Sequence, residues 1–158
     1  MARRIFHLPT RLYDWHLGWL LGRRFLRLTH VGRRSGRTYH TVLEVIGSGH
    51  DELYVMAGFG GSADWYQNLQ QHPALEVAVG RRRFAPAHRN LDLTEAASVL
   101  GDYERRNRLM GFAVRRVLSR LVGWPYDGSP DARTRIVREL PIVAFALPAD
   151  GRTRTTAG

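Results

Sequence analysis

The amino-acid sequence predicts a mainly β (α+β) domain: a small barrel of about six antiparallel strands with peripheral helices. Three observations lead to this prediction. Short apolar segments alternate with glycine-rich turns in the first half of the chain, two helical segments follow, and a last apolar segment near the carboxyl terminus returns to the sheet. The 158 residues are enough for one domain core, and the absence of cysteine excludes disulfides and thiolate metal sites.

The first half of the chain is expected to consist of hairpins. Several segments combine β-branched or aromatic residues with flanking turn residues, which is the composition of strands. These strands are expected at residues 25–31, 37–46, 52–57, 75–79 and 83–91. A glycine loop at 58–61 leads into a short helix, which Ser62 or Asp64 caps and which ends before Pro73. Pro86 places the last of the strands at an edge of the sheet.

The second half is expected to be mostly helical. Helices are expected at residues 92–106, 109–121 and 132–140, and a closing strand at 141–147. Asp92 and Glu95 form a capping-box pattern at the start of the first helix. The second helix carries arginines on one side and an apolar side made of Phe112, Val117, Leu118 and Leu121.

The chain is expected to have three parts: an amphipathic helical segment at 1–24, the barrel domain at 25–148 and a flexible tail at 149–158. Two interpretations of the first part stay open: it packs on the domain core, or it makes a peripheral contact with a membrane surface. Its apolar stretch is far shorter than the ~20 residues of a membrane span. No signal-peptide pattern is present, so a cytoplasmic location is expected.

The charge of the chain indicates an anionic partner. All 24 basic residues are arginine, against 14 acidic residues, which gives a net charge of +10. Guanidinium groups bind carboxylates and phosphates through two parallel hydrogen bonds. The absence of lysine excludes Schiff-base chemistry and a P-loop lysine. Nucleic-acid binding is not expected, because aromatic residues do not interleave with the arginine runs and no recognition motif is present.

Two glycine-containing segments are candidate anion sites. Gly32-Arg33-Arg34-Ser35-Gly36 with Arg37 lies on a turn between two strands, where N–H groups, a hydroxyl and guanidinium groups can converge; an ordinary solvated turn is the alternative. The loop Gly58-Phe59-Gly60-Gly61 opens onto a helix start, where N–H groups and the helix dipole favour an anion. Arg81-Arg82-Arg83 is either a solvated hairpin tip or an extension of the anion site.

Other common sites are excluded by pattern. The seven histidines show no metal-ligand spacing, so no metal site is expected. Neither a Gly-x-Ser-x-Gly nucleophile elbow nor a Gly-x-Gly-x-x-Gly dinucleotide loop occurs in the sequence.

Four stretches of the chain carry a more specific signal. They are Thr29-His30-Val31-Gly32-Arg33-Arg34-Ser35-Gly36-Arg37, then Tyr54-Val55-Met56-Ala57-Gly58-Phe59-Gly60-Gly61, then Trp65-Tyr66-Gln67-Asn68-Leu69 with His72-Pro73 and Val77-Ala78-Val79-Gly80, and Leu140-Pro141-Ile142-Val143. In order and spacing, over roughly residues 25–147, the chain resembles the deazaflavin-dependent nitroreductase family of actinobacteria, relatives of the split-barrel flavin reductases. The resemblance implies a split β-barrel that binds coenzyme F-420, a deazaflavin with a phosphodiester and an oligoglutamate tail. FMN is the less favoured cofactor.

The resemblance also assigns cofactor-binding residues by position. It implies that the turn holds the phosphate and tail, that Thr41 and Val42 lie under the deazaflavin ring, and that the glycine loop lines the phosphate side. The full set is Arg33, Arg34, Ser35, Gly36, Arg37, Thr41, Val42, Ala57, Gly58, Gly60, Gly61 and Trp65. The chain departs from the family pattern at Thr38-Tyr39-His40, where an Arg-Pro or Pro-Arg step is frequent, at Phe59, where many members carry lysine, and at the shorter Ser62-Ala63-Asp64.

The function implied by the resemblance is that of an oxidoreductase. It would transfer a hydride from reduced coenzyme F-420 to an electron-poor small molecule: a quinone, an enone or a nitro compound. The cofactor carries this chemistry, so the side chains orient it and exclude water. Candidate proton donors are Tyr126, Tyr66 and Tyr39. The alternative is a barrel that binds a flavin, a heme or another tetrapyrrole without turnover; the oligomeric state is not predicted.

Overall fold

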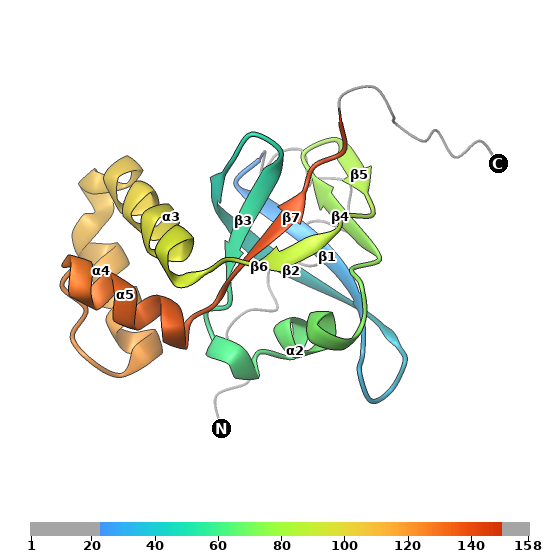
Figure 1. The fold of residues 1–158 in the computed structure, drawn as a ribbon, viewed down its shortest axis with the longest axis horizontal. Helices are drawn as coiled ribbons and strands as arrows, with labels where there is room; N and C mark the ends of the chain where they lie inside the picture. Colours follow the sequence, from blue (N-terminus) through green and yellow to red (C-terminus); the bar gives the residue numbers. More distant parts are fainter. Residues whose placement is uncertain (1–22, 150–158) are drawn as a thin grey trace.

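Seven antiparallel strands form one curled sheet, a half-barrel, in the computed structural model, which describes residues 23–149 (Figure 1). The strands are β1 (Phe25–Val31), β2 (Thr38–Ser48), β3 (Glu52–Met56), β4 (Glu76–Val79), β5 (Arg82–Phe84), β6 (His88–Asn90) and β7 (Ile142–Ala146). Their order in the sheet is β5-β4-β1-β2-β3-β7-β6. The mainly β, split-barrel-like fold expected from the sequence is confirmed.

The helices lie in two places. Helix α2, with the 3-10 turn η2 before it, covers one end of the half-barrel, whereas α3, α4 and α5 form a helical layer at its side (Figure 1). Their bounds are η2 (Gly60–Ser62), α2 (Asp64–Gln71), α3 (Leu93–Arg106), η3 (Arg108–Met110), α4 (Gly111–Val122) and α5 (Pro130–Glu139). Of the four residues expected on the packed side of α4, Leu118 is buried, while Phe112, Val117 and Leu121 are exposed, which corrects the sequence analysis.

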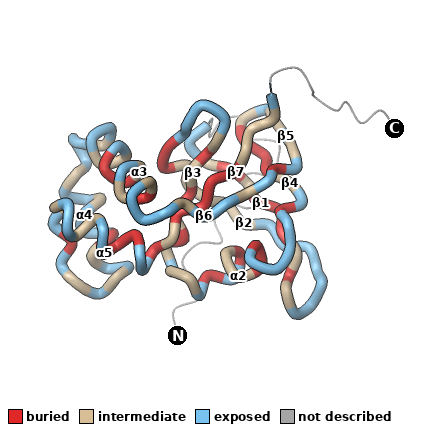
Figure 2. The backbone as a smooth tube through the Cα atoms, viewed as in Figure 1, coloured by how far each residue is buried: buried red, intermediate tan, exposed pale blue. Residues whose placement is uncertain are grey.

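Two buried cores share the sheet. Val143 and Phe145 of β7 belong to the barrel core, and Ile142 of the same strand belongs to the core of the helical layer, because successive strand residues point to opposite faces. The buried stretches in Figure 2 follow the central strands and the inner sides of α3 and α5. Burial on both faces explains why the closing strand reads as an unbroken apolar run.

The segment expected as one strand at 83–91 is two strands, β5 and β6. β5 pairs with β4 and β6 pairs with β7, so the two segments lie at opposite edges of the sheet. Buried Pro86 lies between them and lacks the N–H group that a continuous ladder needs. The chain crosses between the edges here, which curls the sheet and makes the strand number seven instead of about six.

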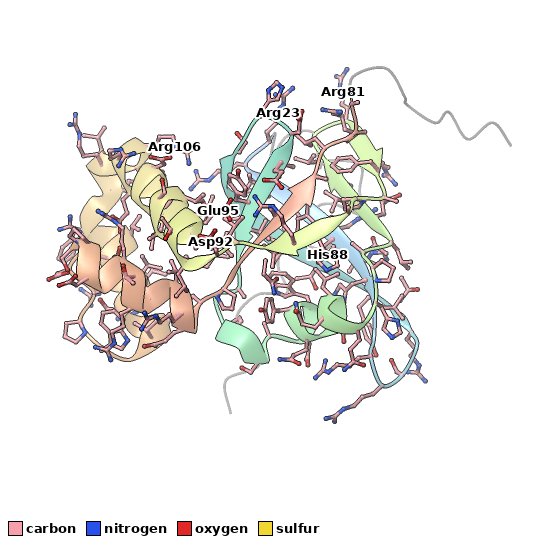
Figure 3. All side chains as sticks on the ribbon, in the orientation of Figure 1. Arg23, Arg81, His88, Asp92, Glu95 and Arg106 are labelled. Carbon is pink, nitrogen blue, oxygen red and sulfur yellow. The ribbon has the colours of Figure 1, made fainter. Side chains whose placement is uncertain are left out.

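Helices α3 and α2 begin differently. The capping box of α3 is confirmed: the Glu95 N–H donates to Asp92 Oδ1 at 2.8 Å, and the Asp92 N–H donates to Glu95 Oε2 at 3.2 Å (Figure 3). Neither Ser62 nor Asp64 caps α2, which is preceded by Ala63. Ser62 Oγ instead donates to a carbonyl of the glycine loop, and Asp64 lies in the first turn, where its charge suits the helix dipole.

Two expectations fall almost entirely outside the described residues. These are the amphipathic helix at 1–24 and the tail at 149–158. Within residues 23–149, the structure contains no helix that is both long and apolar enough to cross a membrane.

A buried polar network connects α2 to the first hairpin. Asn68 Oδ1 accepts the backbone N–H of Arg33 at 3.0 Å, which fixes the orientation of the Asn68 amide. Asn68 Nδ2 therefore donates to His30 Nδ1 at 2.9 Å. The proton of the His30 ring is then on Nε2, which donates to Thr41 Oγ1 at 3.0 Å. His30 is only 3% exposed, and burial lowers the pKa of its ring to about 4, with a smaller contribution from His40.

This network makes the fold sensitive to acid. Because the folded-state pKa lies below the ordinary value of 6.5, the stabilisation by neutral His30 is complete above pH 6.5 and is lost as the pH falls toward 4. The loss is on the order of 3 kcal/mol, at 1.36 kcal/mol for each pH unit between the two values. We expect the free energies of unfolding of wild type and His30→Gln to converge over this range in urea titrations.

His50→Gln provides the control, because the His50 side chain is 97% exposed. Its free energy of unfolding should follow that of wild type at every pH. Parallel curves for wild type and His30→Gln between pH 6.5 and 4 would show that His30 does not titrate with folding.

Candidate functional site

The turn between β1 and β2, residues 32–37, is closed by its two glycines; we call it the basic turn. The Gly32 N–H donates to the Arg37 carbonyl at 2.8 Å, and the Gly36 N–H donates to the Gly32 carbonyl at 2.9 Å. Gly36 has φ +67°, in the left-handed region. A Cβ on Gly32 would lie 2.6 Å from Ser35 Oγ and 2.7 Å from the Tyr39 ring, so a larger residue there would displace both side chains.

The three arginines of the basic turn differ in their surroundings. Arg33 Nη1 donates to Asn68 Oδ1 at 3.0 Å and lies 3.4 Å from Asp64 Oδ1, so this guanidinium is held against α2. Arg34 and Arg37 are exposed. Because Asp64 offsets the charge of Arg33, the positive charge that the turn offers to an anion comes mainly from Arg34 and Arg37.

Ser35 and Tyr39 add hydroxyl groups to the same place. Ser35 Oγ accepts the Arg37 N–H at 3.2 Å and lies 3.0 Å from Tyr39 Oη. Residues 32–35 of the basic turn line a cavity of about 280 Å³ together with Tyr39, Asp64 and Asn68. This cavity combines hydroxyl and guanidinium donors, which is the donor set that a phosphate or carboxylate requires.

The glycine loop is shaped partly by packing. Ala57 is buried and its N–H donates to the Pro141 carbonyl at 2.8 Å. Gly60 has φ +72°, and a Cβ there would approach the Glu139 carbonyl oxygen to 2.9 Å. The Gly61 carbonyl accepts a hydrogen bond from the Gln67 side chain. The loop thus joins α2 to α5 and β7, in addition to any role in binding.

An apolar cavity of about 320 Å³ lies between the sheet and the helical layer. β2, β3, the glycine loop, α3 and α4 contribute to its walls. Its apolar walls include Ile46, Met56, Val114, Val117 and Leu121. Gly58 belongs to the lining, and a Cβ there would lie 3.7 Å from Leu121 Cδ1, so a small residue keeps the cavity open on this side.

Val42 and Thr41, both expected beneath the ring, lie on different faces of β2. Val42 shares its face with Glu44, which lines the apolar cavity. Thr41 points to the opposite face, where its hydroxyl binds buried His30. The structure therefore places Val42 on the strand face that carries Glu44, although Val42 does not itself line the cavity, and gives Thr41 a role in positioning the strand.

A polar pair that the sequence analysis missed lies in the wall of the apolar cavity. Tyr103 Oη donates to Glu44 Oε1 at 3.2 Å, and Arg24 Nε lies 3.5 Å from the same oxygen. Burial, followed by the charge of Glu44, raises the pKa of Tyr103 to about 12. The phenol therefore keeps its proton at neutral pH. The sequence signal was Glu44 itself, a carboxylate within an otherwise apolar strand.

The tyrosines expected as proton donors are dispersed. The Tyr126 hydroxyl donates to Glu104 inside the helical layer, where burial raises its pKa. Tyr66 Oη accepts from Asn90 Nδ2 at 3.3 Å. Tyr39 lies at the basic turn. None of these three tyrosines lines the apolar cavity within the described part of the chain.

Trp65 and the Arg81-Arg82-Arg83 run lie away from the two cavities. Trp65 is buried in the barrel core. The arginine run is at the β4–β5 hairpin, near the start of β1, whereas the basic turn follows the end of β1 (Figures 1 and 3). The run therefore does not extend the basic turn. No group of three or more His, Cys, Asp or Glu residues that could hold a metal occurs in residues 23–149.

Comparison with solved structures finds similar folds at low sequence identity. One, a protein of unknown function from Agrobacterium tumefaciens, Atu2129, has a TM-score of 0.50 and 11% identity, over 92% of this chain and 58% of that one. An F420-H2 dependent reductase, FDR-A, has a TM-score of 0.48 and 18% identity, over 78% of this chain and 95% of that one. A third structure, described as a domain-swapped dimer, has a TM-score of 0.47 and 15% identity, over 87% of this chain and 98% of that one. No curated protein sequence gives a significant match.

A family model gives the decisive comparison. The model for F420H(2)-dependent quinone reductases matches residues 11–115, more than half of the chain. The matched range contains the basic turn, the glycine loop, Glu44 and Tyr103. The expected enzyme class and cofactor are confirmed by this match. The chain belongs to the F420H(2)-dependent quinone reductase family and is an oxidoreductase that uses coenzyme F-420.

Proposed function

We propose that this enzyme transfers a hydride from reduced coenzyme F-420 to an electron-poor, apolar acceptor that binds in the cavity between β2, β3 and α4. A quinone, an enone or a nitro compound has the required chemistry. The observation that supports this proposal is the cavity itself: about 320 Å³, with mainly aliphatic walls and one half-buried carboxylate–phenol pair. Such a pocket suits a flat apolar molecule with a reducible oxygen.

The residues present fit the cofactor. The basic turn, with Gly36 in the left-handed conformation, offers Arg34, Arg37 and Ser35 to a phosphate and an anionic tail. Tyr39 at this turn and Glu44 at the apolar cavity are five residues apart on β2, about 17 Å at ~3.3 Å per residue. The Tyr39 and Glu44 side chains alternate to opposite faces of the strand. An elongated molecule would therefore lie along the outer face of β2, with its ring toward the apolar cavity and its charged tail at the exposed Arg34 and Arg37 of the basic turn. FMN, with one phosphate and no glutamate tail, uses less of this charge.

Reduced coenzyme F-420, when bound, supplies the hydride. The protein contributes binding, orientation and the exclusion of water. Arg34 and Arg37 bind the anionic end, Val42 lies on the face of β2 that the ring would cover, and the aliphatic walls on α4 exclude water from the acceptor. A second proposal concerns the proton: when the acceptor binds, the Tyr103 O–H turns from Glu44 to the acceptor oxygen and donates its proton there, and the phenolate then takes a proton from water.

The first expectation concerns cofactor affinity. Replacing Arg34 and Arg37 together with alanine leaves the Arg33 contacts to Asn68 and Asp64 intact and removes two charge-assisted contacts, each worth on the order of 1.5–3 kcal/mol. Their exposed setting favours the lower value, so we expect the affinity for coenzyme F-420 to fall about a hundredfold, since 1.4 kcal/mol is tenfold. Titration followed by deazaflavin fluorescence measures this change.

Arg81→Ala with Arg82→Ala is the matched control, because it removes the same charge at the other end of β1. Its affinity should stay near that of wild type at physiological ionic strength. An equal loss in the two double variants would mean that overall charge, and not the basic turn, binds the cofactor.

The second expectation concerns the proton donor. Tyr103→Phe keeps the ring and removes the hydroxyl, so we expect kcat for quinone reduction to fall about a hundredfold, the lower end of the usual contribution of general acid catalysis. The affinity for coenzyme F-420 should stay unchanged. Tyr126→Phe, which removes a hydroxyl outside the cavity, should keep the wild-type kcat. If Tyr103→Phe reduces quinone at the wild-type rate, water supplies the proton.

A further inference from the structure

The corner between α3 and α4 exposes three large apolar side chains. Leu109 is fully exposed, Phe112 is 79% exposed and Met110 is 59% exposed. We call residues 109–112 the apolar corner. Side chains of this size are usually buried in the core. Single exposed apolar residues are common on protein surfaces, but three within four residues form a contiguous apolar patch. The fold of the helical layer does not require them, because Leu118 packs α4 onto its core.

The surroundings of the apolar corner are strongly basic. Between Glu104 and Asp127 the chain contains no acidic residue and six arginines: Arg105, Arg106, Arg108, Arg115, Arg116 and Arg120. Among residues 23–149, one of these six, Arg105, makes an ion pair, with Asp102. Arg106 donates to the Ile46 carbonyl at 2.6 Å at the end of α3 (Figure 3). The remaining four leave a positive charge on both sides of the corner.

We propose that the apolar corner inserts into the surface of an anionic phospholipid bilayer. Leu109, Met110 and Phe112 would enter the boundary between headgroups and acyl chains, and the arginines would contact the phosphates. Long guanidinium side chains suit this position because their stems lie along apolar surface while the charged end reaches the headgroups. The partner is therefore identified by two complementary properties, an apolar interior and a negative surface.

Charge disfavours the other occupants of this surface. A second copy would bring the same arginines against their own counterparts across a twofold contact. The segment 1–24 carries five arginines and a single acidic residue, Asp14, so it has the same sign as the corner. Nucleic acid would match the charge, but leucine and methionine do not stack on bases as aromatic side chains do.

The position of the corner gives membrane binding a consequence for catalysis, and this step rests on the proposed function. Met110 of the corner and Val117 of α4 line the apolar cavity, together with Asn107. A corner inserted at the bilayer surface would hold this side of the cavity against lipid. An acceptor dissolved in the membrane could then enter without crossing water, so the acceptor would be a lipid-soluble molecule.

Vesicle sedimentation with the full chain tests the membrane contact without cofactor or acceptor. We expect binding to vesicles of three parts phosphatidylcholine and one part phosphatidylglycerol, and weak binding to phosphatidylcholine alone. Leu109→Ser with Phe112→Ser should lower the partition coefficient at least about tenfold. Leu75→Ser with Leu93→Ser, at two other exposed leucines, should change it less than about twofold. Thermal unfolding verifies that both variants are folded.

The lack of cysteine allows a direct probe of insertion. An environment-sensitive fluorophore on Leu109→Cys should shift to the blue with anionic vesicles, and the same fluorophore on Asp51→Cys, at the β2–β3 turn, should not. Wild-type vesicle binding by the serine variant of the corner would assign the contact to residues 1–24 and overturn the proposal. A dimer that wild type forms without vesicles, and that the serine substitutions dissociate, would also overturn the proposal. A fluorophore response to duplex DNA but not to vesicles would overturn it as well.

A water-soluble quinone separates this proposal from the proposed function. Leu109 and Phe112 do not line the apolar cavity, so the serine variant should reduce a water-soluble quinone at the wild-type rate. With a long-chain quinone in anionic vesicles, the same variant should be at least about fivefold slower than wild type, since it leaves the surface that holds the acceptor. Equal rates of wild type and the serine variant in vesicles would overturn the proposed entry of the acceptor from the membrane. Inactivity of every form with both quinones would overturn the proposed function alone.

Discussion

The anion-binding cavity at the basic turn and the apolar cavity beside β2 both depend on the buried contact between Asn68 and His30. Asn68 receives the backbone and side chain of Arg33, which sets the direction of the basic turn, and it donates to His30. His30 in turn holds Thr41, so β2 keeps the register that points Val42 and Glu44 outward. Buried polar side chains such as Asn68 and His30 are costly unless every group finds a partner, and here each does. One network therefore positions the anion site and the strand that leads to the apolar cavity.

β2 is the element on which the two functions meet. It is eleven residues long and begins at the basic turn. Its inner face belongs to the barrel core, while Ile46 on its outer face belongs to the core of the helical layer. A register slip of one residue would exchange these faces and expose every core side chain on the strand. The same packing that stabilises the barrel therefore fixes where Glu44 meets Tyr103.

Much of the fold follows from local sequence signals, because turns and alternation are local. The basic turn, the capping box at Asp92 and the closing strand lie where the pattern predicts them. The division of segment 83–91 into β5 and β6 depends on which edge each half reaches, and that is a property of the closed sheet. Likewise, the pairing of Glu44 with Tyr103 joins residues 59 positions apart, and no local pattern predicts such a contact.

The candidate site divides in the same way between local and tertiary information. Arginines on a glycine turn indicate anion binding from composition alone, but the separate role of Arg33 becomes visible only with Asp64 beside it. The apolar side of α4 shows the converse. A helical pattern of Val117 and Leu121 predicts burial against a core, and the structure places both side chains at the apolar cavity instead.

Exposed aliphatic side chains around an apolar cavity carry a cost that the fold alone does not explain. Leaving Val117 and Leu121 partly in water forgoes part of the ~1.5–3 kcal/mol that full burial of such a side chain contributes. A helix that needed only to be stable could carry polar residues at these positions, because Leu118 already anchors it. The retained apolar surface therefore favours a ligand that covers it. Because the family match ends at residue 115, most of α4 lies beyond the matched region, and this wall of the cavity is where the chain can specify its own acceptor.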